Sequence, residues 1–467
     1  MNIGLRIPHD GSLSARMTSH QHRLELERLP RLARDPAFHG MTATQFLGAF
    51  NDNLFKQLVL LICVARGQGD YQPIAQAMFA LPFVLFSGFA GYLSDLTGKR
   101  SIVVLAKVAE IAIMFLGMAA FWIGGVRPDW ELAALMAVLF LMATQSAFFG
   151  PAKYGILPEM FRGRDLPRVN GMVQMTTFVA IIFGTALAGY AKEWFGARLW
   201  LVSGMCVAIA VVGTATSLLV RRTPIAHPGL RFRLSSLAIN AETWRMLRGD
   251  RPLMRVLLVA SLFWFIGGVV QQAVNAFGVR QWGVGDARTS LMMACMGVGI
   301  AIGCVVAGKA SHERVSFRLV TVGAWGIVIS LGAVAALGLL PFPEGIGDRE
   351  SSAYVPPAVG VVEWLARLDL TLAGFFAGLF VVPLQVFMQA RPPEDQKGRM
   401  IGAMNLVNWI GILGSAAFFA ACTGLFGEQA ALARAGIDAP ISWTFALLAL
   451  ALLPVALLYH PREEALE

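Results

Sequence analysis

Residues 74–124 read IAQAMFALPFVLFSGFAGYLSDLTGKRSIVVLAKVAEIAIMFLGMAAFWIG. Two apolar runs, 74–94 and 101–124, are separated only by a short polar segment that contains DLTGKR. A helix needs about 20 mostly apolar residues to cross the hydrocarbon core of a bilayer. The stretch therefore predicts two consecutive membrane-spanning helices joined by a tight polar loop.

The composition of the whole chain agrees with membrane embedding. Of 467 residues, 56% are hydrophobic and only 14% are charged, and the mean hydropathy is +0.62. Soluble globular proteins have about a quarter of their residues charged, so this class is excluded. The five cysteines all fall inside apolar runs and lack the spacing of a zinc site or a disulfide framework, which predicts small buried side chains and no metal.

Apolar runs of similar length recur along the chain and predict an all-α, polytopic membrane protein with twelve transmembrane helices. The runs lie near 41–64, 74–94, 101–124, 131–150, 171–191, 199–219, 253–275, 289–308, 319–340, 370–390, 401–424 and 441–459.

The lysines and arginines are distributed unevenly between the two sides of the predicted helices. With a cytosolic N-terminus, 27 of the 38 lie on the cytosolic side and nine on the other, while Lys56 and Lys107 lie within spans. This is the positive-inside pattern, and it predicts a multi-pass protein of the bacterial inner membrane with both termini in the cytosol. The net charge of +9 therefore reflects topology and membrane lipids as partners, and no nucleic acid is expected.

A long basic segment divides the predicted spans into two groups of six. The sequence predicts a cytosolic tail at 1–40, a six-helix bundle at 41–219, a central cytosolic loop at 220–252, a second six-helix bundle at 253–460 and a short tail at 461–467. Two six-helix halves around a central cavity are the architecture of major facilitator transporters.

The loop after the second span reads GYLSDLTGKR over 91–100, and it resembles the major facilitator signature G-x-x-x-D-x-x-G-[KR]-[KR]. An acidic group at a helix end interacts with the positive N-terminus of a neighbouring helix, and glycines allow close approach of backbones. The resemblance implies a gating role for Gly91, Asp95, Gly98 and Arg100, which would latch the two halves together on the cytosolic side.

The first span contains Asn51, Asp52, Asn53 and Lys56 in an otherwise apolar run. A charged side chain at the centre of a bilayer costs about 2.5–3.5 kcal/mol on insertion scales, so these residues should face a cavity or a partner. Asp52 and Lys56 are four residues apart with the acid first, so a structural ion pair on one helix face is one interpretation. A substrate-binding surface formed by Asp52 and Asn53 is the other.

The fourth span ends with Gly150-Pro151, followed by Lys153 and Tyr154. Glycine and proline predict a break in the helix, and broken helices line transporter sites. Lys153 is a point charge suited to a phosphate, and Tyr154 offers a hydroxyl group on an apolar ring. The alternative is that Lys153 only marks the cytosolic end of the span.

Amide side chains are scattered through the other spans and predict a hydrated cavity between the halves. Some of them are expected merely to bridge helices, which is the usual role of amides in membranes. We select Gln174, Gln271, Gln272 and Gln385 as candidate substrate-binding residues. The other amides are Gln145, Asn275, Gln389, Asn405 and Asn408.

Four phrases give the sequence a more specific resemblance. FLGAFNDN at 46–53, FFGPAKYGILPE at 148–159, FWF at 263–265 and VVPL at 381–384 resemble segments of bacterial lysophospholipid transporters, in particular the transporter half that is fused to acyltransferase and acyl-carrier-protein synthetase modules. The resemblance extends over nearly the whole chain from about residue 41. Stand-alone enterobacterial transporters are expected to have a basic residue where this chain has Gln271.

The resemblance implies transport of a lysophosphatidylethanolamine-like lysophospholipid to the cytosolic leaflet for reacylation, by alternating access and without a cofactor. Asp52 would meet the ammonium group and Lys153 the phosphate, and a separate acyltransferase/acyl-carrier-protein synthetase is an implied partner. The alternative on the same fold is a proton-coupled exporter of drugs or small amphiphilic metabolites. An enzyme is not expected, because none of the seven histidines begins the acyltransferase motif H-x-x-x-x-D.

Overall fold

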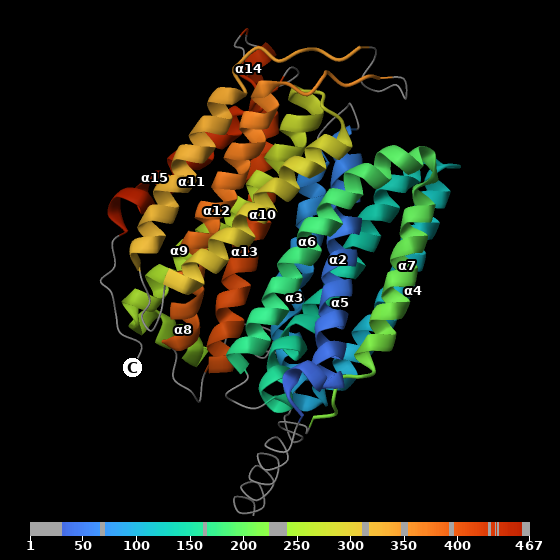
Figure 1. Ribbon diagram of the computed structural model, residues 1–467, viewed down its shortest axis with the longest axis vertical. Helices are drawn as coiled ribbons and strands as arrows, with labels where there is room; N and C mark the ends of the chain where they lie inside the picture. Colours follow the sequence, from blue (N-terminus) through green and yellow to red (C-terminus); the bar gives the residue numbers. More distant parts are fainter. Residues whose placement is uncertain are drawn as a thin grey trace, which may run out of the picture.

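The computed structural model is all-helical over the residues that it describes (Figure 1). Its only β pairing among these residues is an isolated antiparallel bridge between Ile346 and Val355. The all-α prediction is therefore confirmed. The predicted tails, apart from residues 30–40, and most of the central loop lie outside the described residues. The described residues are 30–65, 71–161, 166–223, 241–310, 317–346, 354–391, 397–427, 431–434, 436 and 439–459.

The first part of the chain forms long apolar helices, because a chain in lipid must satisfy its backbone hydrogen bonds within the segment. A short 3-10 turn, η1, precedes them, and another, η3, joins the last two. The elements are η1 (Leu32–Arg34), α2 (Pro36–Ala65), α3 (Gln72–Leu96), α4 (Lys99–Gly124), α5 (Pro128–Met160), α6 (Leu166–Phe195), η3 (Gly196–Arg198) and α7 (Leu199–Ser217).

The second part of the chain repeats this succession of long helices. A π-helical turn, η5, extends the first long helix of this part, and two short helices, α8 and α14, lie outside the apolar runs. The elements are α8 (Ala241–Gly249), α9 (Arg251–Ala276), η5 (Phe277–Gln281), α10 (Asp286–Ala310), α11 (Phe317–Leu337), α12 (Val361–Ala390), α13 (Lys397–Leu425), α14 (Ala431–Arg434) and α15 (Trp443–Leu458).

Among the residues that the structure describes, ten helical stretches are long and apolar enough to cross a membrane. One of them, Met175–Ser217, contains most of α6 together with η3 and α7, and α15 is a shorter apolar helix. The large apolar side chains exposed on the outside of the helices would face lipid. Examples are Leu105, Trp122, Phe183, Val305 and Leu368.

Two predicted features of the helices are wrong. Helix α5 continues through Gly150 and Pro151 to Met160, so the predicted break is absent. Packed membrane helices tolerate proline because neighbouring groups compensate for the missing backbone donor. Helix α12 begins at Val361, well before the predicted residue 370, because charged side chains in its first turns are neutralised by ion pairs.

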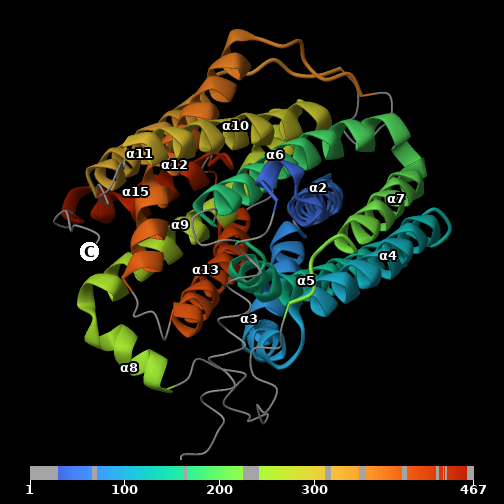
Figure 2. The same ribbon diagram turned by 60° about the horizontal axis from the view of Figure 1, so that its bottom comes forward.

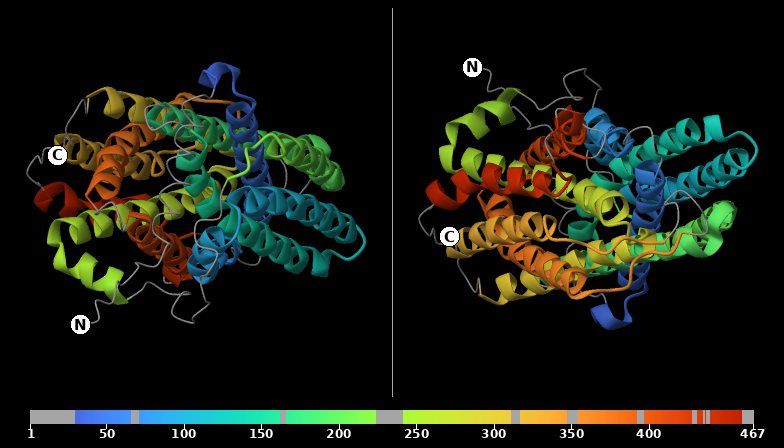
Figure 3. Two further views of the ribbon diagram at one scale, coloured as in Figure 1. Left: turned by 90° about the horizontal axis from the view of Figure 1, so that it is seen from below. Right: turned by 90° about the horizontal axis from the view of Figure 1, so that it is seen from above.

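The two parts of the chain use the same packing scheme. Helix α2 packs against α6 and α7, α4 against α5 and α7, and α3 against α5. In the second part, α9 packs against α13 and α15, α11 against α12 and α15, and α10 against α12. The parts meet mainly where α3 contacts α13 and where α6 contacts α10, and they lie side by side when viewed along the helices (Figure 3).

Helices α10 and α12 approach each other backbone to backbone. A Cβ atom at Gly299 would lie 2.0 Å from the carbonyl oxygen of Thr371, and one at Gly374 would lie 2.0 Å from that of Met296. Small residues on both helices permit such close packing in membranes. Neither glycine can therefore be replaced by a larger residue unless the backbone of the other helix moves.

Helix α8 is a short amphipathic helix within the predicted central loop. It lies beside α9 and α13 at one end of the molecule (Figure 2). Leu247 is buried against the second half, whereas Arg248 is exposed, with its guanidinium 4.9 Å from the centre of the Trp244 ring. This arrangement places an arginine at the surface and an apolar residue in the core.

Candidate substrate site

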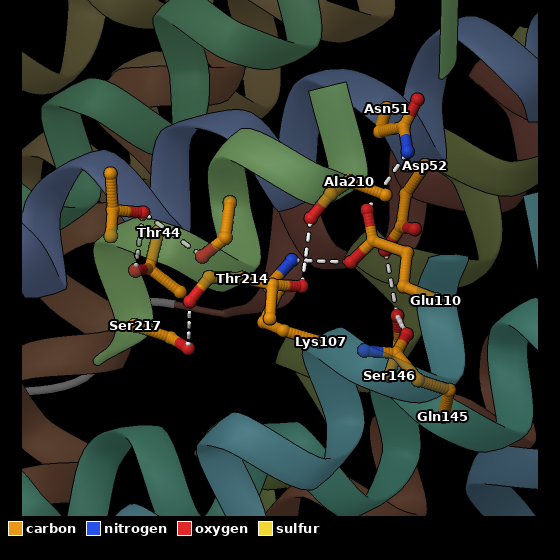
Figure 4. A network of polar contacts seen from close by, with 12 residues as sticks. Thr44, Asn51, Asp52, Lys107, Glu110, Gln145, Ser146, Ala210, Thr214 and Ser217 are labelled. Atoms are coloured by element: carbon orange, nitrogen blue, oxygen red, sulfur yellow. Dashed lines mark hydrogen bonds and ion pairs between the residues drawn. The ribbon is translucent and has the colours of Figure 1, made fainter. Parts of the chain in front are cut away.

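The polar segment of α2 lies in the middle of the helix, where α4, α5 and α7 surround it (Figure 4). Ser146 of α5 donates a hydrogen bond to Oδ2 of Asp52 at 2.6 Å. The other carboxylate oxygen, Oδ1, is buried and has no hydrogen-bond partner. A buried carboxylate oxygen without a donor is costly, so Oδ1 of Asp52 is an acceptor that a further hydrogen-bond donor would stabilise.

The predicted alternative of an Asp52–Lys56 ion pair is absent. Lys56 donates to Oε1 of Gln271 in α9 at 2.9 Å, and its ammonium lies 4.5 Å from the centre of the Phe79 ring. Lys56 therefore links the two halves, and its partner is 215 residues away in the chain. An amide oxygen and an aromatic face from other helices take the place of the carboxylate on its own helix.

The other predicted site residues are spread over several helices. Asn53 donates to the carbonyl oxygen of Ala49 on its own helix at 2.7 Å. Lys153 of α5 is buried, with 8% of its surface exposed, and Gln385 of α12 is exposed. The side chains of Tyr154 and Gln174 lie outside the described part of the structure.

Two of the predicted amides, Gln272 and Asn275, form a ladder between the halves together with Gln57 and Gln72. Gln57 of α2 donates to Asn275 of α9 at 2.9 Å, and Asn275 donates to Gln72 of α3 at 3.0 Å. Gln72 in turn donates to the carbonyl oxygen of Gln272 at 3.3 Å, while the side-chain oxygen of Gln272 is buried and unpartnered. These amides bridge helices, as the sequence analysis allowed for some of them.

One ion pair and two further hydrogen bonds join the halves at the same end of the bundle as the amide ladder. Lys192 of α6 pairs with Asp286 of α10 at 2.8 Å, and Glu193 accepts a hydrogen bond from the backbone of Ala287 at 2.8 Å. Arg280 donates to the carbonyl oxygen of Val64 at 2.8 Å. Within the described residues, every hydrogen bond and ion pair between the halves lies toward the end where α2 and α6 finish and α10 begins. We call this set the outer contacts.

The predicted gating residues lie at the opposite end. Gly98 is the residue before α4, and Arg100 donates to the carbonyl oxygen of Leu218, which follows α7 in the same half. Gly91 lies in α3 with open space around it. The side chain of Asp95 lies outside the described residues. The latch between halves stays a prediction.

Sequence reasoning missed a buried ion pair beside Asp52. Lys107 and Glu110 of α4 pair with each other, and each side chain is only 2% exposed. Asn51 of α2 donates to Glu110 at 2.8 Å and to the carbonyl oxygen of Cys206 at 3.2 Å. The three-residue spacing of Lys107 and Glu110 inside an apolar run was the signal that could have revealed the pair.

A second buried cluster lies in the second half, at the end where α10 and α12 begin. Glu363 of α12 is fully buried and pairs with Arg288 of α10 and Arg367 of α12. Arg288 also donates to the carbonyl oxygen of Pro357. The four-residue spacing of Glu363 and Arg367 was visible in the sequence, but both were assigned to a loop. Among the described residues, no group of three or more His, Cys, Asp or Glu side chains could hold a metal ion.

Comparison with known proteins places this architecture in a family. A curated relative from Enterobacter sp. (strain 638), named lysophospholipid transporter LplT, is 26% identical over 370 residues, covering 78% of this chain and 83% of the relative. The protein of the same name from Salmonella gallinarum (strain 287/91 / NCTC 13346) is 27% identical over 366 residues, with coverages of 78% and 82%. The crystal structure of a D-xylose-proton symporter aligns with a TM-score of 0.63 at 16% identity, covering 91% of this chain and 98% of that one. The family model described as Major Facilitator Superfamily matches residues 42–416, and the chain belongs to this superfamily of membrane transporters.

Proposed function

We propose that this protein transports a lysophospholipid across the bacterial inner membrane to the cytosolic leaflet, where the lipid is reacylated. The names of the curated relatives and the four sequence phrases support the substrate class. The structural observation that carries the proposal is the Asp52 carboxylate, one oxygen of which is buried and unpartnered in the middle of the bundle. A cationic head group would supply the missing donor.

The proposed architecture has twelve spans in two six-helix bundles, α2 to α7 and α9 to α15 without α14. The repeated packing scheme supports it, since each helix contact named above for the first part has a counterpart in the second. The domain boundaries predicted from the sequence, with α8 in the central loop, belong to this proposal. The excess of lysine and arginine supports a cytosolic location for both termini.

Labelling can test this orientation. Cysteines introduced at residues 235 and 350 should react with a membrane-impermeant thiol reagent from opposite faces, 235 from the cytosol and 350 from outside. Labelling of both from the same face would overturn the twelve-span topology.

With this orientation, the outer contacts close the periplasmic side. The structure would then represent the state that is open to the cytosol, and alternating access would require the outer contacts to break. In the opposite state, we propose that Gly91, Asp95, Gly98 and Arg100 help to close the cytosolic side. The outer contacts and this segment lie at opposite ends of α2 and α3, as such a mechanism requires.

We propose that the head group lies near Asp52, Asn53, Lys153 and Tyr154. Asp52 would accept hydrogen bonds from the ammonium group, and Lys153 would donate to the phosphate. The amides Gln174, Gln271, Gln272 and Gln385 would contribute as the halves move, with the acyl chain along apolar walls. Because reacylation must follow transport, a separate acyltransferase/acyl-carrier-protein synthetase is the proposed partner.

Transport by the purified protein in vesicles tests the substrate class. Labelled lysophosphatidylethanolamine in the outer leaflet should become protected from extraction by albumin at a rate that depends on the protein, whereas the diacyl lipid should not. Protein-free vesicles and vesicles with Lys153→Met serve as controls. Protection at the protein-free rate, together with proton-driven movement of a drug-like cation, would replace this proposal with the exporter.

A further inference from the structure

The buried Lys107–Glu110 pair adjoins the proposed head-group site but is not used in it. Both residues project from α4 toward α2, and Asn51 of α2 holds the second oxygen of the Glu110 carboxylate at 2.8 Å (Figure 4). The ring of Phe149 in α5 lies 5.3 Å from the Lys107 ammonium. Helices α2, α4 and α5 therefore fix this ion pair in place.

The contact at Gly48 locates the ammonium group of Lys107. A Cβ atom there would lie 2.2 Å from Nζ of Lys107, so the ammonium rests directly on the α2 backbone. Gly48 and Asp52 are four residues apart and share one face of α2, about one helical turn from each other. Ser146, which donates to Asp52, and Phe149, whose ring lies beside Lys107, are three residues apart on one face of α5. Lys107 is thus near two carboxylates and binds only one of them.

We propose that Glu110 is a positioning residue that holds Lys107 away from Asp52 and so keeps the Asp52 carboxylate open to the amine of the substrate. A buried ammonium needs a carboxylate partner, and without Glu110 the carboxylate that remains on the adjoining face of α2 is Asp52. Glu110 satisfies Lys107 and anchors Asn51, the residue before Asp52. This inference rests on the proposed function, in which Asp52 receives the amine.

A purely structural ion pair makes a different prediction. Removing one charge of a buried pair destabilises the fold in either case, and removing both relieves that cost, so the yield of folded protein does not separate the roles. If the pair only fixes α4 on α2, the folded Glu110→Gln protein should have the wild-type KM. If Glu110 keeps Lys107 from Asp52, the folded Glu110→Gln protein should have a raised KM that the double variant restores. The KM of the folded variants therefore distinguishes the two roles.

Transport kinetics in vesicles provide the first readout. Glu110→Gln should raise the apparent KM for lysophosphatidylethanolamine roughly tenfold or more, because a charge-assisted contact to the head is lost. The double variant Lys107→Met/Glu110→Gln should return KM to within about threefold of the wild type, less than the loss of one such contact. Glu110→Asp, which keeps the charge, should resemble the wild type. The Lys99–Glu159 ion pair of α4 and α5 provides matched controls, Glu159→Gln and Lys99→Met/Glu159→Gln, which should leave the KM of the folded protein unchanged.

Carbodiimide labelling of Asp52 provides a second readout that does not depend on transport. Dicyclohexylcarbodiimide attacks protonated carboxyl groups in apolar surroundings, and an ammonium partner suppresses the protonated form. Mass spectrometry should find labelled Asp52 in the wild type, less label in Glu110→Gln and restored label in the double variant. If Glu110→Gln does not fold, the double variant decides alone, since it must retain both the label and transport.

The outcomes separate the two proposals. A folded double variant that transports no better than Glu110→Gln, with unchanged Asp52 labelling in all variants, would overturn the role of Glu110. The expected labelling pattern in a protein whose Asp52→Asn variant transports lysophospholipid normally would support the role of Glu110 and overturn that of Asp52 in head-group binding.

Discussion

The two halves share a packing scheme but bury their charges at different depths. In the first half, Lys107 and Glu110 lie in the middle of α4, next to the unpartnered oxygen of Asp52. In the second half, Arg288 and Glu363 lie in the first turns of α10 and α12, at the end where the outer contacts occur. The same helix arrangement therefore carries two kinds of buried pair.

The difference in depth indicates a difference in role. Glu363 binds two arginines, and one of them also holds the carbonyl oxygen of Pro357 in the segment before α12, so this cluster joins α10, α12 and their connection. The pair of the first half contacts α2 next to the candidate site. We expect the cluster of the second half to govern stability and the pair of the first half to govern transport.

The largest effect should follow Glu363→Gln. Loss of this carboxylate leaves two arginines without their buried partner, which costs about 3–5 kcal/mol. The variant should unfold at a markedly lower temperature in detergent and yield little folded protein. The matched control Glu344→Gln, at an exposed position near the same end, should leave the unfolding temperature unchanged. If Glu363→Gln unfolds at the wild-type temperature, the cluster of the second half does not govern stability, and the contrast between the halves is overturned.

Lys153→Met should leave the fold intact and impair transport. Every lysophospholipid carries the phosphate, so the apparent affinity should fall roughly tenfold or more for amine-headed and glycerol-headed substrates alike. Lys153→Arg should restore it in part, because guanidinium also binds phosphate but is larger and planar. The measurement is vesicle transport over a range of substrate concentrations. Equal kinetics for Lys153→Met and the wild type would show that this lysine only marks the cytosolic end of its span.

Gly48→Ala tests how tightly the pair in the first half is enclosed. A methyl group at this position meets the Lys107 ammonium, and overpacking in a buried site costs typically about 1–3 kcal/mol. The variant should therefore unfold at a lower temperature than the wild type. Gly332→Ala in α11, where nothing lies near the added atom, is the matched control and should not be destabilised. An undisturbed Gly48→Ala protein would show that Lys107 can move freely.

The smallest effect should come from the outer contacts. Lys192 and Asp286 are partly exposed, so Asp286→Asn should cost up to about 1 kcal/mol and shift the equilibrium toward outward opening by about fivefold. In a cysteine-free background, Ser290→Cys, which is buried beside Gly189, should then react about fivefold faster with an impermeant thiol reagent from outside. Asp250→Asn alters an ion pair within the second half and should not change this rate. An unchanged rate for Asp286→Asn would show that this pair does not hold the outer side closed.

Hydropathy could predict most of the fold, because each span must satisfy its own backbone hydrogen bonds and leaves a long apolar run. Hydropathy failed where charged residues pair inside a helix. Glu363 and Arg367 end the apolar run in the sequence, but because they form an ion pair, the helix continues through them. The site could be predicted only in part. Asp52 could be selected because a charged side chain inside a span costs free energy. The partner of Lys56 could not be predicted from residues on the same helix, because Gln271 comes from the other half.

The glycine contacts between α10 and α12 have a mechanical consequence. Since Gly299 and Gly374 place each backbone against the other, α10 cannot tilt away from α12 without opening a gap along much of their length. The two helices should therefore move together as one rigid unit. A pull on the first turn of α10, where Asp286 meets α6, is then transmitted as a torque to α12 and on to α11, which packs against it. A local event at one ion pair would thus turn a whole half of the transporter.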